Sequence, residues 1–152
     1  MKTLLHCLLW LTMSASALVS AESPAHVSDC APQGIALGGY DAVSYHQQSG
    51  PLMGKPGLAE EVDGLQYLFT SEANRATFNA AQEKYLPVYS GWCAATLAMG
   101  RLACPDYTNF KIENGRLLLF ELAGFTNGRT LWNTDPSGFR QRADTNFEQL
   151  AP

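Results

Sequence analysis

The sequence has few charged residues and no cluster of basic ones, which excludes two classes of partner. Charged side chains make up 16% of the 152 residues, with 10 basic against 14 acidic. Nucleic acids and anionic membranes attract clustered Lys and Arg side chains. Neither is therefore expected to bind this protein.

Common catalytic motifs are also missing. The chain contains no CxxC pair, no HExxH motif and no glycine-rich loop of the kind that cradles phosphate. Of the three histidines, only His46 lies in the region expected to fold, because His6 and His26 lie near the N-terminus. No Ser/His/Asp arrangement is indicated, so the sequence favours a protein that is not an enzyme.

The longest uncharged stretch lies at the N-terminus. Residues 4–19 follow Lys2, carry no charge and are interrupted by polar side chains, and small residues stand at Val19-Ser20-Ala21. This pattern is typical of a cleaved signal peptide and too short for a comfortable membrane span. We therefore expect a signal peptide over 1–21, an N-terminal lead over 22–33 and one domain over 34–150.

The mature chain is predicted to be acidic and either periplasmic or secreted. Lys2 leaves with the leader, so 9 basic residues face 14 acidic ones and the formal charge falls from −4 to −5. No later stretch is apolar enough to suggest stable membrane insertion after cleavage.

Three cysteines remain after cleavage, which leaves one thiol unpaired. An exported protein meets an oxidising compartment, where disulfides form. Cys30 and Cys104 are the natural pair, because a bridge between them would fasten the lead to the domain and leave Cys93 free. Bridges from Cys93 to either partner remain alternatives.

Local patterns predict an α+β domain. Apolar runs flank Asp63-Gly64 and Asn114-Gly115, which are strong signals for two β-hairpins. Ser71 is placed to cap a helix over 72–80. The other elements expected are a short strand over 42–45, a helix over 91–99 and one or two helices over 126–150. Strands and helices do not alternate as in βαβ units, and no internal repeat is evident.

Four motifs follow one another along the domain. They read GGYDAVSYH over 38–46, VDGLQYLF over 62–69, KYLPVYSGWCA over 84–94 and NGRLLL over 114–119. In this order they resemble the secreted YHS-domain family, and the resemblance extends over about 35–150. It implies a small twisted antiparallel sheet with packed helices, distantly related to treble-clef (TRASH-like) metal modules. It also implies metal binding, most often of copper, and no defined activity.

The residues that would bind copper or zinc are Cys93, His46 and Asp41. Cys93 belongs to the recognised motif and is expected at a helix start, where backbone N–H groups favour a thiolate. A thiolate and the imidazole of His46 together suit either metal. Asp41 would add an oxygen ligand or orient the histidine. Each residue also has a purely structural alternative: a buried thiol, a surface imidazole and a carboxylate that shapes a turn.

Two other functions remain open. The domain could be a metal-free module that binds a small molecule or another periplasmic protein, through an apolar pocket near Trp92. It could also be a thiol enzyme with Cys93 as nucleophile.

Overall fold

The computed structural model describes residues 30–150, so the predicted signal peptide over 1–21 lies outside the described residues. Helices and small antiparallel sheets pack together, which confirms the predicted α+β class. Within the described range, no helix is long and apolar enough to cross a membrane.

Both predicted hairpins are present. β1 (Lys55–Val62) pairs with β2 (Leu65–Phe69), and β3 (Asp106–Glu113) pairs with β4 (Arg116–Phe120). All four residues of the two turns have positive φ, as this type of turn requires. A third, shorter pair joins β5 (Leu122–Ala123) to β6 (Thr126–Asn127). The strands thus form three separate two-stranded sheets instead of one.

The helices follow the predicted order, but one short helix, α2, is additional and α3 begins later than predicted. The observed helices are α1 (Glu72–Ala80), α2 (Gln82–Tyr85), α3 (Ala94–Ala98), α4 (Gly128–Trp132) and α5 (Pro136–Leu150). Ser71 caps α1, because its hydroxyl accepts the Asn74 N–H at 3.1 Å. The prediction that α3 spans 91–99 is wrong at its start, because Tyr89, Ser90 and Gly91 have positive φ. Right-handed helix is incompatible with such φ values.

The strand predicted over 42–45 is also wrong. The segment turns, and a short 3-10 helix covers Ser44–His46. The Asp41 carboxylate accepts the Val43 N–H at 2.9 Å, which gives the backbone a local partner in place of a strand neighbour. Local hydrogen bonding thus overrides the apolar run.

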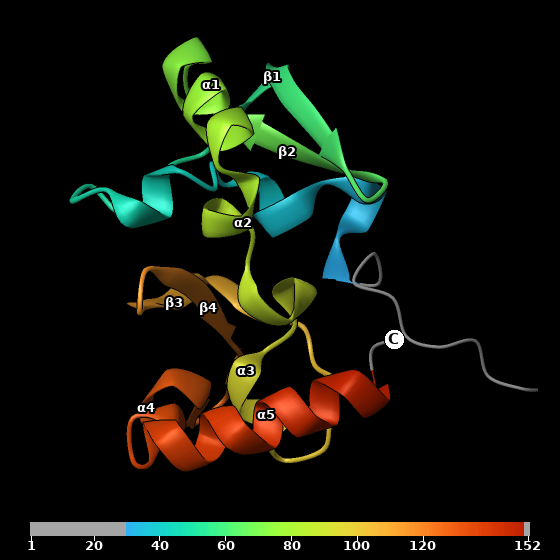
Figure 1. Cartoon of the computed structure of the whole chain (residues 1–152), viewed down its shortest axis with the longest axis vertical. Helices are drawn as coiled ribbons and strands as arrows, with labels where there is room; N and C mark the ends of the chain where they lie inside the picture. Colours follow the sequence, from blue (N-terminus) through green and yellow to red (C-terminus); the bar gives the residue numbers. More distant parts are fainter. Residues whose placement is uncertain (1–29, 151–152) are drawn as a thin grey trace, which may run out of the picture.

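Strand β4 lies between two hydrophobic clusters and contributes to both. Leu117 and Leu119 belong to an upper cluster with Phe69 and Phe78, whereas Leu118 and Phe120 face a lower cluster. These four β4 side chains are fully buried. Figure 1 shows β1, β2 and α1 above this strand pair, and α3, α4 and α5 below it. The alternation of side chains along one strand therefore joins the two halves.

The disulfide forms as predicted between Cys30 and Cys104, and Cys93 is free and buried. The Tyr107 hydroxyl donates a hydrogen bond to the Cys30 carbonyl, so the start of the described chain is held by a covalent and a polar contact. This arrangement fastens residues 30–34 against the loop before β3.

The second half repeats the backbone of the first, which the sequence did not indicate. In β1–β2 the pairing shifts between Lys55 and Ala59, and in β3–β4 it shifts at the corresponding place, between Asp106 and Phe110. Ahead of each hairpin, three successive residues have positive φ, at 37–39 and at 89–91. Two residues before each triplet, the chain also bridges to its own hairpin in parallel, Ile35 to Gln66 and Pro87 to Leu117.

Few side chains are shared between the halves, which explains why the repeat is not evident in the sequence. The identical pairs are Gly39 and Gly91, Ala42 and Ala94, Gly64 and Gly115, Leu68 and Leu119, and Phe69 and Phe120. The second half also contains the extra β5–β6 pair between its hairpin and its helix α4. The two halves are therefore two versions of one backbone unit.

Candidate functional site

Asp41 is fully buried, and its carboxylate is already occupied by hydrogen bonds. It accepts the Val43 N–H, both the N–H and the hydroxyl of Thr70, and the Asn74 amide, at 2.7 to 2.9 Å. These donors come from the following turn, from the residue after β2 and from α1. The carboxylate thus holds three segments of the upper half together.

Cys93 lies at the equivalent position of the lower half. Its backbone N–H bonds to Ala103 O at 3.0 Å, as the Asp41 N–H bonds to Leu52 O at 2.8 Å. Its sulfur accepts the N–H of Glu121, the residue after β4, at 3.0 Å. It also caps α3 by accepting the Thr96 N–H at 3.5 Å.

The equivalence of Asp41 and Cys93 supports a structural role for both. Each is a fully buried acceptor that connects the residue after a hairpin to the turn that follows the positive-φ triplet. Buried N–H groups need such acceptors, because an unpaired one costs about 1–3 kcal/mol. The two positions lie in different halves and do not form one site.

His46 packs at the edge of the upper cluster, whereas Cys93 belongs to the lower one. Its ring packs edge-on against Tyr85, with ring centroids 5.1 Å apart. Its Nε2 is sealed from solvent and has no hydrogen-bond partner among residues 30–150. Burial, with a smaller contribution from Lys84, lowers the pKa of His46 below its usual value of 6.5.

Within residues 30–150, no group of three or more His, Cys, Asp or Glu side chains is placed to hold a metal ion. Cys93, His46 and Asp41 are therefore not gathered into one cluster. Binding of copper or zinc stays a prediction, and the geometry of the predicted ligands does not favour it.

Three hollows meet along the connector 86–90, between the two halves. Each is lined by Pro87 and Ser90. The one we call the Tyr67 hollow has a volume of about 130 Å³. Its lining residues are Val62, Asp63, Leu65, Tyr67, Leu86, Pro87 and Ser90. The pocket predicted near Trp92 is not this one, because Trp92 is packed in the lower cluster and does not line it.

Tyr67 is the notable polar residue of the Tyr67 hollow. The side chain is only 6% exposed and stacks on Phe78, with ring centroids 5.4 Å apart. Its hydroxyl has no hydrogen-bond partner among the described residues, whereas those of Tyr45 and Tyr89 donate to Tyr107 O and to Asp144. The Tyr67 hydroxyl is nevertheless open to solvent. Within residues 30–150, the only side-chain polar atom that has no partner and is also sealed from solvent is His46 Nε2.

The Tyr67 hydroxyl keeps its proton at neutral pH. Burial, then the nearby charge of Asp63, raise the pKa of Tyr67 to about 12. A protonated phenol can donate one hydrogen bond and accept others. The wall of the Tyr67 hollow therefore offers an unused polar group among apolar side chains.

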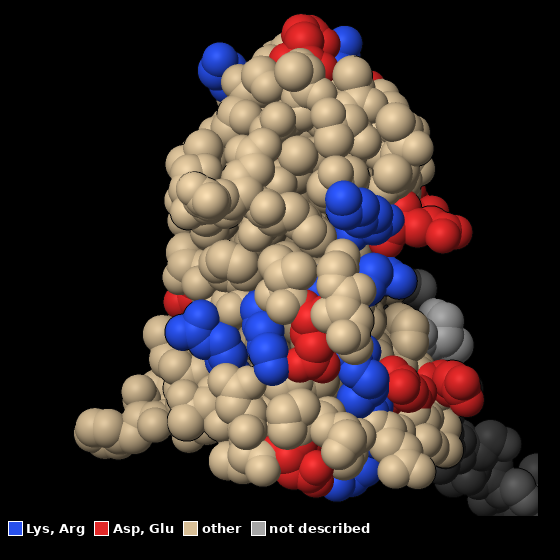
Figure 2. All heavy atoms as spheres, turned by 60° about the vertical axis from the view of Figure 1, so that its left-hand side comes forward, with Lys and Arg blue, Asp and Glu red and all other residues tan. Residues whose placement is uncertain are grey.

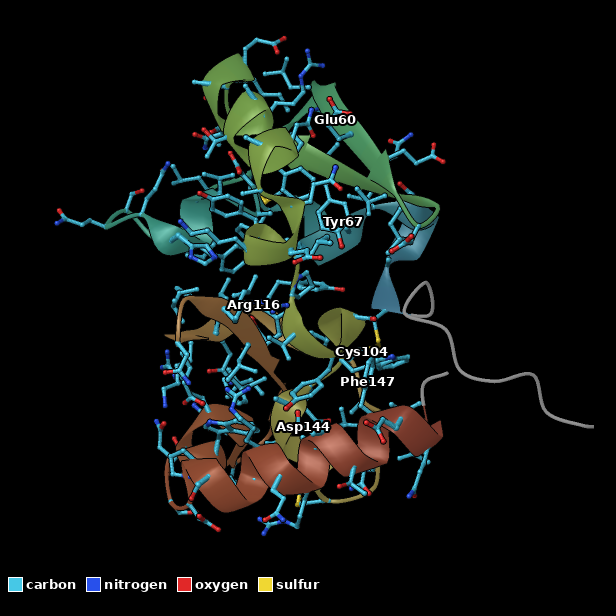
Figure 3. All side chains as sticks on the ribbon, viewed as in Figure 1. Glu60, Tyr67, Cys104, Arg116, Asp144 and Phe147 are labelled. Carbon is cyan, nitrogen blue, oxygen red and sulfur yellow. A yellow bond between two sulfur atoms is a disulfide. The ribbon has the colours of Figure 1, made fainter. Side chains whose placement is uncertain are left out.

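A second, wider hollow of about 580 Å³ also lies along the connector. We call it the α5 hollow, because Asp144 and Phe147 of α5 line it together with Glu83, Arg116 and residues 86–90. Figure 3 shows Tyr67 in the upper half, and Arg116, Asp144 and Phe147 below it.

The charged surface shows no large area of one sign on the face seen in Figure 2, where basic and acidic side chains intermingle over the lower half. Lys111 and Arg140 both pair with Glu113 at 2.6 Å, which is one source of this mixing. This agrees with the absence of a basic cluster in the sequence.

Comparison with family models, curated proteins and solved structures finds no match to this chain. The resemblance to secreted YHS domains therefore remains a prediction that rests on the four motifs.

Sequence reasoning missed Tyr67, and no local signal marks it. Tyr67 alternates with Gln66 and Leu68 in β2 as an ordinary core residue would. Only the tertiary structure shows that its hydroxyl has no partner among the described residues.

Proposed function

We propose that this protein is an exported, metal-free binding module that holds a small organic molecule in the Tyr67 hollow. The observation that supports this most directly is the unused hydroxyl of Tyr67, a nearly buried residue that lines the hollow together with four apolar side chains. The Cys30–Cys104 disulfide is compatible with a protein that works in the periplasm or outside the cell.

The state of the Tyr67 hydroxyl favours a binding role. It has no partner among the described residues but is open to solvent, so a ligand in the hollow can reach it. A ligand that covers the hydroxyl has to bond to it, because a hydroxyl cut off from every partner costs about 1–3 kcal/mol. The alternative partner is one ordered water in the smallest of the three hollows, which Tyr67 also lines and whose volume is about 10 Å³.

The backbone beside the hollow is also strained. Tyr89 and Ser90 have φ of 58° and 51°, although neither is glycine. Each such residue costs about 1–2 kcal/mol relative to ordinary conformations. Ser90 lines all three hollows and Tyr89 lines the α5 hollow, so the strained backbone forms part of their walls.

The size of the hollow limits the ligand. Engineered apolar cavities of about 150 Å³ in another protein bind benzene, so a hollow of about 130 Å³ suits a single ring. Val62, Leu65, Leu86 and Pro87 would contact the ring, and the Tyr67 hydroxyl would bond to its polar substituent. Larger ligands would have to extend toward the α5 hollow.

The first test compares two tyrosine variants by chemical unfolding. Tyr67→Phe should leave the free energy of unfolding unchanged or raise it slightly, because no bond within residues 30–150 is lost. Tyr45→Phe is the matched control, and we expect it to lose about 1 kcal/mol because the Tyr45 hydroxyl donates to Tyr107 O at 2.8 Å. An equal loss in Tyr67→Phe would show that its hydroxyl serves the fold and would contradict the proposal.

The second test measures binding itself. Benzyl alcohol, titrated into the protein and followed by NMR, should shift the resonances of Tyr67, Leu86 and Ser90. Val62→Phe should abolish these shifts by filling the hollow, whereas Leu58→Phe adds a ring to the same strand outside it. Binding that is absent, or that persists in Val62→Phe, would overturn the proposed site.

A further inference from the structure

Resting on the proposed function, we infer that the ligand of the Tyr67 hollow is a small hydrophobic amine. Its ring lies between Leu65, Leu86 and Pro87, and its ammonium group faces the carboxylate of Asp63. The Tyr67 hydroxyl bonds to a polar atom of the ligand or to a water beside it.

Asp63 is the one charged side chain among the residues that line the Tyr67 hollow. It lies in the β1–β2 turn, exposed at the rim, and forms no ion pair within residues 30–150. Its charge raises the pKa of Tyr67, so the carboxylate lies close enough to act on the hydroxyl. The polar end of the hollow is therefore negative.

The residues around the Tyr67 hollow add to its negative charge. The α5 hollow beside it is lined by two carboxylates, Glu83 and Asp144, against one guanidinium, Arg116. The predicted mature chain is also acidic, with a formal charge of −5. An anionic ligand would meet repulsion from Asp63, whereas a cation gains from it.

The carboxylate of Asp63 is not required by the turn that contains it. The equivalent turn of the second hairpin has Asn114, with φ of 53° against 51° for Asp63. Asparagine and aspartate both tolerate this left-handed conformation. The charge at 63 is therefore free to serve recognition, and the second hairpin provides an uncharged counterpart.

The test compares three probes that share one ring. Benzylamine, benzyl alcohol and benzoate are titrated at low salt, and dissociation constants are measured by NMR on the native chain, Asp63→Asn and Asn114→Asp. We expect benzylamine to bind roughly threefold to tenfold more tightly than benzyl alcohol, and benzoate to bind most weakly. The preference should decrease with added salt, because the rim is exposed.

Asp63→Asn should abolish the preference for benzylamine while binding of benzyl alcohol is retained. Asn114→Asp is the matched control: it adds a carboxylate to the turn outside the hollow, and the preference should persist. Equal binding of benzylamine and benzyl alcohol, or a preference that survives Asp63→Asn, would overturn the amine while the proposed site stands. If no probe binds, both the amine and the proposed function are wrong.

Discussion

Asp41 and Cys93 show how one structural task is met by two different side chains. Both accept the N–H of the residue that follows a hairpin, Thr70 in one half and Glu121 in the other. The carboxylate has more acceptor capacity and also binds the Asn74 amide, whereas the sulfur accepts only backbone donors. This position therefore requires a hydrogen-bond acceptor, and either a carboxylate oxygen or a thiol sulfur can serve.

Removing the acceptor at 93 should therefore destabilise the fold. We expect Cys93→Ala to lower the free energy of unfolding by about 2–3 kcal/mol, because two N–H groups lose their partner. Cys93→Ser keeps an acceptor and should lose less. Denaturant unfolding measures both. Equal losses in the two variants would mean that packing alone matters at this position.

Burial of His46 should make the protein less stable in acid. The pKa of His46 in the folded protein lies below 6.5 because of burial and of Lys84. As the pH falls below about 6.5, the unfolded chain takes up a proton that the folded protein resists, so the free energy of unfolding decreases.

The variant His46→Gln isolates this contribution. Stability measured from pH 8 to pH 5 should fall less steeply in His46→Gln than in the native chain, with Lys84 present in both. Parallel curves would show that the imidazole titrates alike in the folded and unfolded states. Above pH 7 the histidine contributes no pH dependence of this kind.

Among the elements, the hairpins form from their own turn residues, whereas α3 depends on its surroundings. Asp63-Gly64 and Asn114-Gly115 both have positive φ, which Asp-Gly and Asn-Gly pairs between apolar runs favour, so local chemistry sets both turns. Helix α3 begins only at Ala94, because the preceding triplet is held in positive φ against the hairpin. Such a constraint cannot be read from a short window of sequence.

Glu113 connects the β3–β4 hairpin to the helices of the lower half. Its carboxylate accepts hydrogen bonds from Arg140 of α5 and Trp132 of α4, and pairs with Lys111. Burial alone would raise the pKa of Glu113, but these hydrogen bonds lower it to about 2. The contribution of the Glu113 carboxylate to the free energy of unfolding is therefore fully present above pH 4.5 and is lost as the pH falls toward 2.

We expect Glu113→Gln to lower the free energy of unfolding by about 1–2 kcal/mol at pH 7. The difference from the native chain should shrink as the pH approaches 2, because the native carboxyl is then protonated. Glu61→Gln, at an exposed position in β1, is the matched control and should have little effect. If the difference in free energy of unfolding between Glu113→Gln and the native chain did not change with pH, the loss would come from altered packing and not from the lost charge.

At the scale of the whole molecule, the two halves are joined through β4, whose alternate side chains enter both clusters. Neither cluster is complete without this strand. The upper half also depends on Leu117 and Leu119, although these residues belong in sequence to the second repeat.

The chain should therefore unfold in one cooperative transition. Leu118→Ala and Leu119→Ala face different clusters, and each should lower the free energy of unfolding by about 2–5 kcal/mol without splitting the transition. Leu122→Ala, on an exposed side chain, should change it little. Near- and far-UV circular dichroism report the transitions, and two separate steps in either core variant would contradict this.

The sequence by itself determined what depends on neighbouring residues. The two hairpins follow from their turn dipeptides, and the start of α1 follows from its Ser71 cap, so both features are decided within a few residues. For the disulfide, the sequence favoured Cys30–Cys104 but left bridges from Cys93 open, and the structure decided between them.

The tertiary structure alone decided the rest. The repeat is carried by φ angles and pairing register, which different side chains can produce, so it left little trace in residue identity. Asp41 and Cys93 became equivalent, and Tyr67 lost any partner within the described chain, only when distant segments were packed together. Burial and hydrogen bonding are properties of neighbours in space, and a single sequence does not state which residues those neighbours are.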